Sequence, residues 1–210
     1  TARRTARGRL VMALVLAICA APVVAAYVAY FIVRPEGRSN YSDLIQPARP
    51  LPTGLPLTDL GGRPVSPAAL RGQWLLVVVG GGACDSVCER QLLLQRQLHE
   101  SLGRERDRVD KLWLVDDGVA PREPTLRAIK AFGHGSHLPF AAATVLHSPG
   151  PALAAWLQPA ARHGLADHLY VVDPRGDWMM RAPADADPGR LKRDLEKLLR
   201  ASAGWDQAGR

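Results

Sequence analysis

The chain has 210 residues, enough for one globular domain and an additional segment. Its formal net charge is +7, but six of the 27 Lys and Arg residues and only two of the 20 Asp and Glu residues precede Leu44. The remainder is therefore nearly balanced in charge, which argues against a nucleic-acid-binding protein. Three cysteines are too few for a disulfide-rich scaffold.

The N-terminal segment predicts a membrane anchor. Residues 1–9 carry arginines and no acidic residue, and residues 10–33 carry no charge at all. The uncharged run is long enough to cross a bilayer, and the arginines place residues 1–9 in the cytoplasm. We expect one transmembrane helix over residues 10–33. A cleaved signal peptide would have a shorter apolar core, and a lipoprotein would need a small residue before Cys19, where Ile18 stands.

A linker and then a globular domain follow the anchor. Residues 34–54 are rich in Pro, Gly and polar side chains, which predicts a tether with little structure. The domain is expected over residues 55–202, followed by a short tail over residues 203–210. It opens with a short strand at residues 57–60, a Gly-Gly turn at residues 61–62 and a returning strand at residues 63–65.

The segment that follows contains the candidate reactive residues. Residues 74–79 are continuously apolar, three glycines come next, and then Cys84 and Cys88 precede apolar residues at helical spacing up to about residue 102. This pattern predicts a buried strand, a tight turn and an amphipathic helix, with the cysteines where the turn becomes the helix.

Cys84 and Cys88 are four residues apart, so in the first turns of a helix they share one face. Helix geometry puts their Cα atoms roughly 6 Å apart, a separation that a disulfide can bridge. Two thiolates at this spacing could equally hold Cu(I) or Zn(II). Because Asp85, Ser86 and Glu89 are polar, we expect the sulfur pair to face solvent at the mouth of the sheet.

The remaining pattern alternates strands and helices. Strands are predicted at residues 112–115, 142–146, 168–172 and 178–181, and helices at residues 124–132, 151–157 and 189–201. This order predicts an α/β fold with three layers, in which sites form at the carboxyl ends of parallel strands. The cysteine turn lies at such an end. Asp116 and Asp117 end one strand and are assigned a turn or solvent role.

Three stretches carry a family resemblance. LPLTDLGGRPVSPAALRGQWLLVVVGGGACDSVC, VDDGVAPREPTLRA and DHLYVVDPRG resemble the Sco/SenC proteins of cytochrome c oxidase assembly. The resemblance implies a thioredoxin-like domain with a central mixed sheet, held by one helix on the periplasmic side of a bacterial inner membrane. It implies copper bound by Cys84, Cys88 and a distant histidine, and cysteines that can also cycle as a thiol pair.

The histidine expected to complete a copper site is His168, next to an aspartate that could orient its ring. His163, on a glycine-containing loop, is the alternative. His134 and His137 in the GHGSH sequence are expected on the surface.

Three functions remain open. The first is a copper-binding factor that uses Cys84, Cys88 and His168 and delivers copper to an oxidase subunit or to another copper- or thiol-carrying membrane protein. The second is a thiol–disulfide oxidoreductase in which Cys84 attacks and Cys88 resolves, keeping the cysteines of a partner reduced. The third is a non-catalytic tethered binding module with a fixed disulfide.

Overall fold

The computed structural model describes residues 2–28, 31, 40–131 and 145–204 of the chain, and it consists of two units, Thr1–Ser39 and Asn40–Arg210. The first unit contains helix α1 (Ala2–Val28), in which Val11–Val28 has a mean hydropathy of 2.5 and none of its side chains is buried. By length and composition this helix can cross a membrane, as the sequence predicts. The predicted span continues to residue 33, partly outside the described residues.

The second unit is built on one mixed sheet of eight strands in the order β1-β8-β7-β4-β5-β6-β2-β3. The central strand β4 pairs in parallel with β5 and antiparallel with β7. The strands are β1 (Asp43–Pro50), β2 (Leu57–Thr58), β3 (Pro64–Val65), β4 (Trp74–Gly80), β5 (Val109–Val115), β6 (Val145–His147), β7 (Leu169–Val172) and β8 (Asp177–Arg181).

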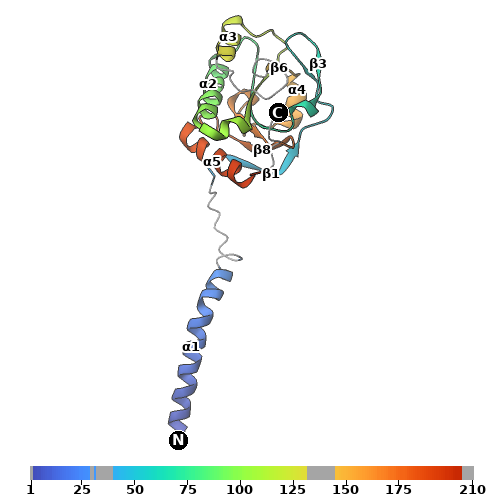
Figure 1. Cartoon of the computed structure of the whole chain (residues 1–210). Helices are drawn as coiled ribbons and strands as arrows, with labels where there is room; N and C mark the ends of the chain where they lie inside the picture. Colours follow the sequence, from blue (N-terminus) through green and yellow to red (C-terminus); the bar gives the residue numbers. More distant parts are fainter. Residues whose placement is uncertain (1, 29–30, 32–39, 132–144, 205–210) are drawn as a thin grey trace. The chain divides into compact units, whose positions relative to one another are not determined.

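Helices cover both faces of the sheet, which confirms the predicted three-layer α/β fold (Figure 1). One face packs against α2 (Ser86–Ser101) and α5 (Pro188–Ala201), and the other against α4 (Gly150–Trp156) and the 3-10 turn η2 (Pro67–Leu70). Helix α3 (Glu123–Ala131) and the turns η3 (Gly103–Arg108) and η4 (Leu165–Asp167) complete the fold.

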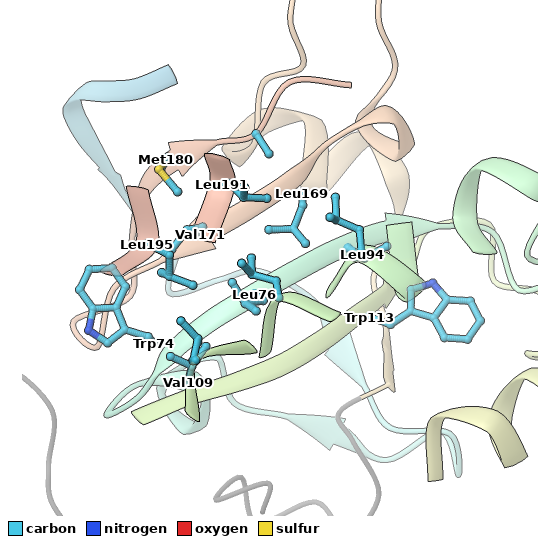
Figure 2. Packing of buried hydrophobic residues seen from close by; sticks show 14 of the residues in the cluster. Trp74, Leu76, Leu94, Val109, Trp113, Leu169, Val171, Met180, Leu191 and Leu195 are labelled. Carbon is cyan, nitrogen blue, oxygen red and sulfur yellow. The ribbon is translucent and has the colours of Figure 1, made fainter. Parts of the chain in front are cut away.

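Strand β4 shows why the sheet has two cores. Every residue of β4 is buried, and alternate side chains point to opposite faces. Leu76 and Val78 belong to the core under α2 and α5, whereas Val77 and Val79 belong to the core under α4. Figure 2 shows the first of these cores, with Trp74 and Trp113 at its opposite ends. A fully buried strand reads as a continuous apolar run, and the sequence does so here.

The expectation of an unstructured tether over residues 34–54 is wrong in its second half. Strand β1 pairs antiparallel with β8 at the edge of the sheet, with Leu44 opposite Met180. Prolines are compatible with an edge strand because one side of such a strand makes no ladder hydrogen bonds. Pro47 and Pro50 therefore gave this segment the composition of a linker although it belongs to the domain.

Candidate functional site

The cysteines lie where β4 passes into α2. Strand β4 ends at Gly80, and α2 begins at Ser86 with Asp85 as its N-cap. One carboxylate oxygen of Asp85 accepts hydrogen bonds from the amides of Val87 and Cys88, both at 3.0 Å. These bonds satisfy two of the amide groups that a helix N-terminus leaves unpaired, and so fix the point where the helix starts.

Cys84 and Cys88 form a disulfide, with their Cα atoms 5.1 Å apart. The prediction that a disulfide can bridge the two cysteines is thereby confirmed, although Cys84 precedes the N-cap of α2 and does not share a helix face with Cys88. The backbone of Cys84 has a φ of 44°, in the left-handed region that few non-glycine residues adopt. Such conformations concentrate at functional sites, where the surrounding structure holds them in place.

The expected exposure of the sulfur pair is wrong, because each cysteine is only 1% exposed. Both side chains belong to the core under α2, together with Trp113. Asp85 and Glu89 are exposed, so the polar residues around the cysteines line the outer side of this turn while the cysteines point inward. Polar neighbours in the sequence therefore did not indicate an exposed face.

A loop that follows β5 lies against the cysteine turn. The Asp117 carboxylate accepts a hydrogen bond from the amide of Gly82, at 3.0 Å to one oxygen and 3.2 Å to the other. A side chain at Gly82 would overlap the carbonyl oxygen of Val119, so the two backbones approach as closely as glycine allows. Residues 117–122, named here the 117–122 loop, are thus tied directly to the turn that carries Cys84.

Arg122 makes the second link between this loop and the disulfide. Its guanidinium donates to the carbonyl oxygen of Cys84 at 2.6 Å and lies 3.4 Å from the carboxylate of Glu89. The Arg122 amide also donates to the carbonyl oxygen of Gly82 at 3.3 Å. Because the Arg122 side chain is 54% exposed, water competes with these contacts.

Two adjacent carboxyl groups at the end of β5 differ in their environment. Burial raises the pKa of Asp116, and the neighbouring charge of Asp117 adds to the effect. Burial also opposes ionisation of Asp117, but the amides of Gly82 and Val119 outweigh it, so the pKa of Asp117 is lowered. Asp117 therefore stays ionised and keeps its hold on the cysteine turn, a turn role as the sequence predicts.

His168 is fixed in a different way. Its Nδ1 lies 2.8 Å from the carbonyl oxygen of Ala182, and its Nε2 accepts a hydrogen bond from the amide of Ala160 at 3.1 Å. The ring therefore carries its proton on Nδ1 and is neutral. Burial, followed by the positive charge of Arg181, lowers the pKa of His168. Both nitrogens are engaged by backbone groups, so neither has a lone pair free for a metal.

His168 and the cysteines lie on opposite faces of the sheet. Leu169 packs in the same core as the disulfide, whereas Tyr170 packs in the core under α4. Because side chains alternate along a strand, His168 shares the face of Tyr170, and the two rings are 6.1 Å apart. The structure thus brings Cys84 and Cys88 together, but it does not bring His168 to them.

The alternative histidine does not change this result. His163 lies beside His168, with ring centroids 5.3 Å apart, and its Nδ1 is 3.4 Å from the carboxylate of Asp167. Within residues 2–28, 40–131 and 145–204, no three His, Cys, Asp or Glu side chains are grouped so as to hold a metal ion. The described residues therefore do not fit a three-ligand copper site. His134 and His137 lie outside the described residues.

Arg122 is the residue of this site that the sequence analysis missed. Spacing gives no signal for it, because Arg122 and Cys84 are far apart in sequence and their contact forms through the main-chain carbonyl of Cys84. Arg122 does fall in the VDDGVAPREPTLRA stretch that carries the family resemblance.

Solved structures with this fold include several Sco proteins. Apo Sco1 from Thermus thermophilus is 20% identical, with a TM-score of 0.55 over 78% of this chain and 99% of its own. A SCO1/SenC family lipoprotein from Bacillus anthracis is 16% identical, with a TM-score of 0.53 over 73% and 98%. Yeast Sco1 is 14% identical, with a TM-score of 0.52 over 75% and 97%. At these identities the likeness establishes the thioredoxin-like fold that the sequence predicts.

The curated proteins include none that matches this sequence. The sequence profile of one family matches residues 74–202, which include β4, the cysteine turn, β7 and α5. The chain belongs to the family of transmembrane-like, thioredoxin-like C-terminal domains.

Proposed function

We propose that this chain is a membrane-anchored thiol–disulfide exchange protein of the Sco type, with Cys84 and Cys88 as its redox pair. The observation that carries the proposal is the 84–88 disulfide at the junction of the central strand and the capped helix α2. This junction lies at the carboxyl end of a parallel strand pair, where open α/β sheets place their sites. The lack of a third ligand among the described residues favours sulfur chemistry over metal binding.

In the reducing direction the exchange takes two steps. The thiolate of Cys84 attacks a disulfide of the partner, a mixed disulfide forms, and one partner sulfur leaves as a thiolate. The thiolate of Cys88 then attacks Cys84, which forms the 84–88 disulfide and releases the second partner thiolate. Two electrons pass to the partner, and a dithiol protein on the same side of the membrane must return the pair to its reduced form.

Access to the sulfurs requires a movement, since each cysteine is 1% exposed in the oxidised form. The 117–122 loop is the segment proposed to move, because polar contacts of Asp117 and Arg122 hold it on the cysteine turn. Single contacts of this kind contribute about 1 kcal/mol each, so opening is within reach of thermal motion or of partner binding.

Copper binding is the second candidate function. It is favoured by the fold likeness to yeast Sco1 with copper bound, which is 12% identical with a TM-score of 0.50 over 79% of this chain. In the reduced protein Cys84 and Cys88 would offer two thiolates, a donor set that suits Cu(I). His168 could join them only by giving up its hydrogen bonds to Ala160 and Ala182 and leaving its face of the sheet.

The proposed partner is a subunit of a respiratory cytochrome c oxidase, or another membrane protein that carries copper or paired thiols. Helix α1 would hold the domain at the membrane surface in reach of such a partner, and the arginines at its N-terminal end, before the apolar span Val11–Val28, would set the domain on the periplasmic side.

Trapping tests the exchange function. The reduced full chain in lipid nanodiscs is mixed with a disulfide-bonded peptide, and products are identified by mass spectrometry. Cys88→Ser should accumulate a mixed disulfide through Cys84, because the resolving thiol is absent. Cys84→Ser is the matched control and should accumulate little. If neither variant forms an adduct while both remain folded, the exchange function is rejected.

Anaerobic titration of the reduced full chain with Cu(I) tests the second candidate. One tightly bound equivalent that is lost in Cys84→Ser would establish copper binding by the pair. The absence of binding at micromolar copper would reject copper binding by the pair and leave thiol exchange or a fixed structural disulfide.

A further inference from the structure

A groove between α2 and α3 begins beside the disulfide. Its volume is about 330 Å³, within the range of ligand-binding pockets. Apolar side chains dominate the lining, and two basic residues of α2 and β5 join them. The residues that define its character are Leu92, Leu93, Trp113 and Ile129, with Arg96 and Lys111.

One large apolar side chain that lines the groove is exposed to solvent. Leu93 on α2 is 50% exposed, whereas its neighbour Leu94 is buried in the core. Leu93 lines the groove beside Leu92 and Ile129, so its exposed side chain is available to an apolar occupant of the groove. Trp113 of β5 is buried and also lines the groove.

One end of the groove adjoins the cysteine turn. Trp113 Nε1 donates to the carbonyl oxygen of Gly80 at 3.3 Å. A Cβ atom at Gly80 would lie 3.3 Å from the Cys88 sulfur and 3.7 Å from Trp113 Nε1. Glu89, which follows Cys88 directly, also lines the groove. A segment bound there would therefore lie against the turn that carries the disulfide.

The other end is basic. Arg96 lies seven residues beyond Glu89 on α2, about 10 Å along the helix axis. Burial lowers the pKa of Lys111 and the charge of Arg96 adds to this, while Glu100 and Asp110 act in the opposite direction. Arg96 and Lys111 both line this end of the groove, so it presents two basic side chains with which an acidic side chain of an occupant would interact favourably.

We propose that this groove binds an extended apolar segment of the protein partner, with an acidic side chain about three to four residues from the partner's reacting cysteine. An extended chain advances about 3.3 Å per residue, so about three residues span the distance along α2 from Glu89, which follows Cys88, to Arg96. The identity of the occupant as a segment of the partner rests on the proposed exchange function. The groove, its apolar wall and its basic end are observed independently of that function.

Binding of short peptides to the oxidised full chain in nanodiscs tests this assignment. One fluorescent peptide carries serine in place of cysteine, apolar residues and a glutamate at the fourth position, and a second carries lysine there instead. Anisotropy should show at least about tenfold tighter binding of the glutamate peptide at low salt, with the difference shrinking as salt is added.

Variants locate the binding. Leu93→Asp should weaken binding of the glutamate peptide by about tenfold or more, since a central apolar contact is lost. Leu60→Asp changes a comparably exposed leucine elsewhere (45% against 50%) and should have no effect. Arg96→Glu should reverse the preference between the two peptides. Equal binding of both peptides, insensitivity to Leu93→Asp, or a co-purified fatty acid that occupies the groove and blocks both peptides would overturn the proposal.

The peptide-binding test of the groove can fail independently of the trapping test of thiol exchange, because the serine peptides cannot react with the disulfide. Selective binding without any trapped adduct would leave the groove in place and reject thiol exchange. Adduct formation with binding that ignores Leu93 and Arg96 would overturn the groove alone.

Discussion

The cysteine turn and the start of β7 lie at the same end of two neighbouring strands, yet they have different roles. Val78 of β4 pairs with Leu169 of β7, so His168 is close to the disulfide along the sheet. The sheet nevertheless separates them, because His168 and the cysteines lie on opposite faces. Proximity along paired strands therefore does not make a joint site unless the side chains also point to the same face.

The two regions also differ in how they are held. His168 is bonded through both ring nitrogens to the backbone of Ala160 and of the buried Ala182, which makes it a structural support. The cysteine turn is held by Asp117 and by the half-exposed Arg122. Breaking the hydrogen bonds of His168 costs free energy because it leaves polar backbone groups unpaired, whereas water can replace the contacts of Arg122. The predictions below test this contrast.

Gly82→Val should have the largest effect. The new side chain would overlap the Val119 carbonyl oxygen and push the 117–122 loop off the cysteine turn. We expect a loss of about 3 kcal/mol in the free energy of unfolding and at least about tenfold faster reduction of the disulfide by a phosphine. Denaturant unfolding and timed alkylation measure the two effects. Gly54→Val is the control, because a Cβ there meets nothing within 4 Å.

His168→Ala should lower the free energy of unfolding by about 2 kcal/mol, since the Ala160 amide and the Ala182 carbonyl lose their partner. The Cu(I) affinity of the reduced protein should stay the same. Competition with a chromogenic Cu(I) chelator measures that affinity. A substantial drop in the variant would mean that His168 reaches the cysteines after all, and the contrast between the two regions would fail.

Stability should decrease on acidification below about pH 6.5, the ordinary histidine pKa. Burial, reinforced by Lys111, lowers the pKa of His99, and burial also lowers that of His168. Below about pH 6.5 the unfolded state therefore binds more protons than the folded state, and the free energy of unfolding rises with pH. Each histidine contributes at most about 1.4 kcal/mol per pH unit. Denaturant unfolding at pH 7.5, 6.5 and 5.5 measures the slope.

His168→Gln should flatten this slope, because the titrating group that burial holds neutral is removed. An unchanged slope in His168→Gln would show that the ring is not held neutral in the folded protein.

Arg122→Gln should speed reduction of the disulfide by about threefold to tenfold, because it removes one charge-assisted hydrogen bond to the Cys84 carbonyl. Stability should change by less than about 1 kcal/mol at this exposed side chain. Arg127→Gln, which removes a similar surface pair with Glu123, is the matched control. Equal reduction rates in all three proteins would show that Arg122 does not hold the site closed.

Asp85→Asn should have the smallest effect on stability, within about 0.5 kcal/mol, because asparagine also caps helices well. Removal of the negative charge should shift alkylation of the reduced pair to lower pH, since the thiolates lose a repulsive neighbour. The pH dependence of iodoacetamide labelling measures this, and an unchanged profile would contradict it.

The sequence predicted what depends on local pattern. The apolar run of β4, the helix after the cysteines and the final helix of the domain all have their expected structure. The closeness of Cys84 and Cys88 was expected from helical spacing, but Cys84 precedes the N-cap of α2 and its left-handed backbone helps to set the distance.

What the sequence did not predict depends on contacts between distant segments. Strand β1 is a strand because it pairs with β8, and the cysteines are buried in a core built from several distant elements. One error was avoidable: alternation along β7 already assigns His168 to the face of Tyr170 and not to that of Leu169.

The reduction potential of the Cys84–Cys88 pair tests the central claim most directly. The full chain in nanodiscs is equilibrated in glutathione and dithiothreitol buffers, and the oxidised fraction is read from the mass of alkylated protein. We predict a potential above about −270 mV, in the range of proteins that exchange disulfides. A value below about −300 mV would identify a structural disulfide and contradict the proposed function.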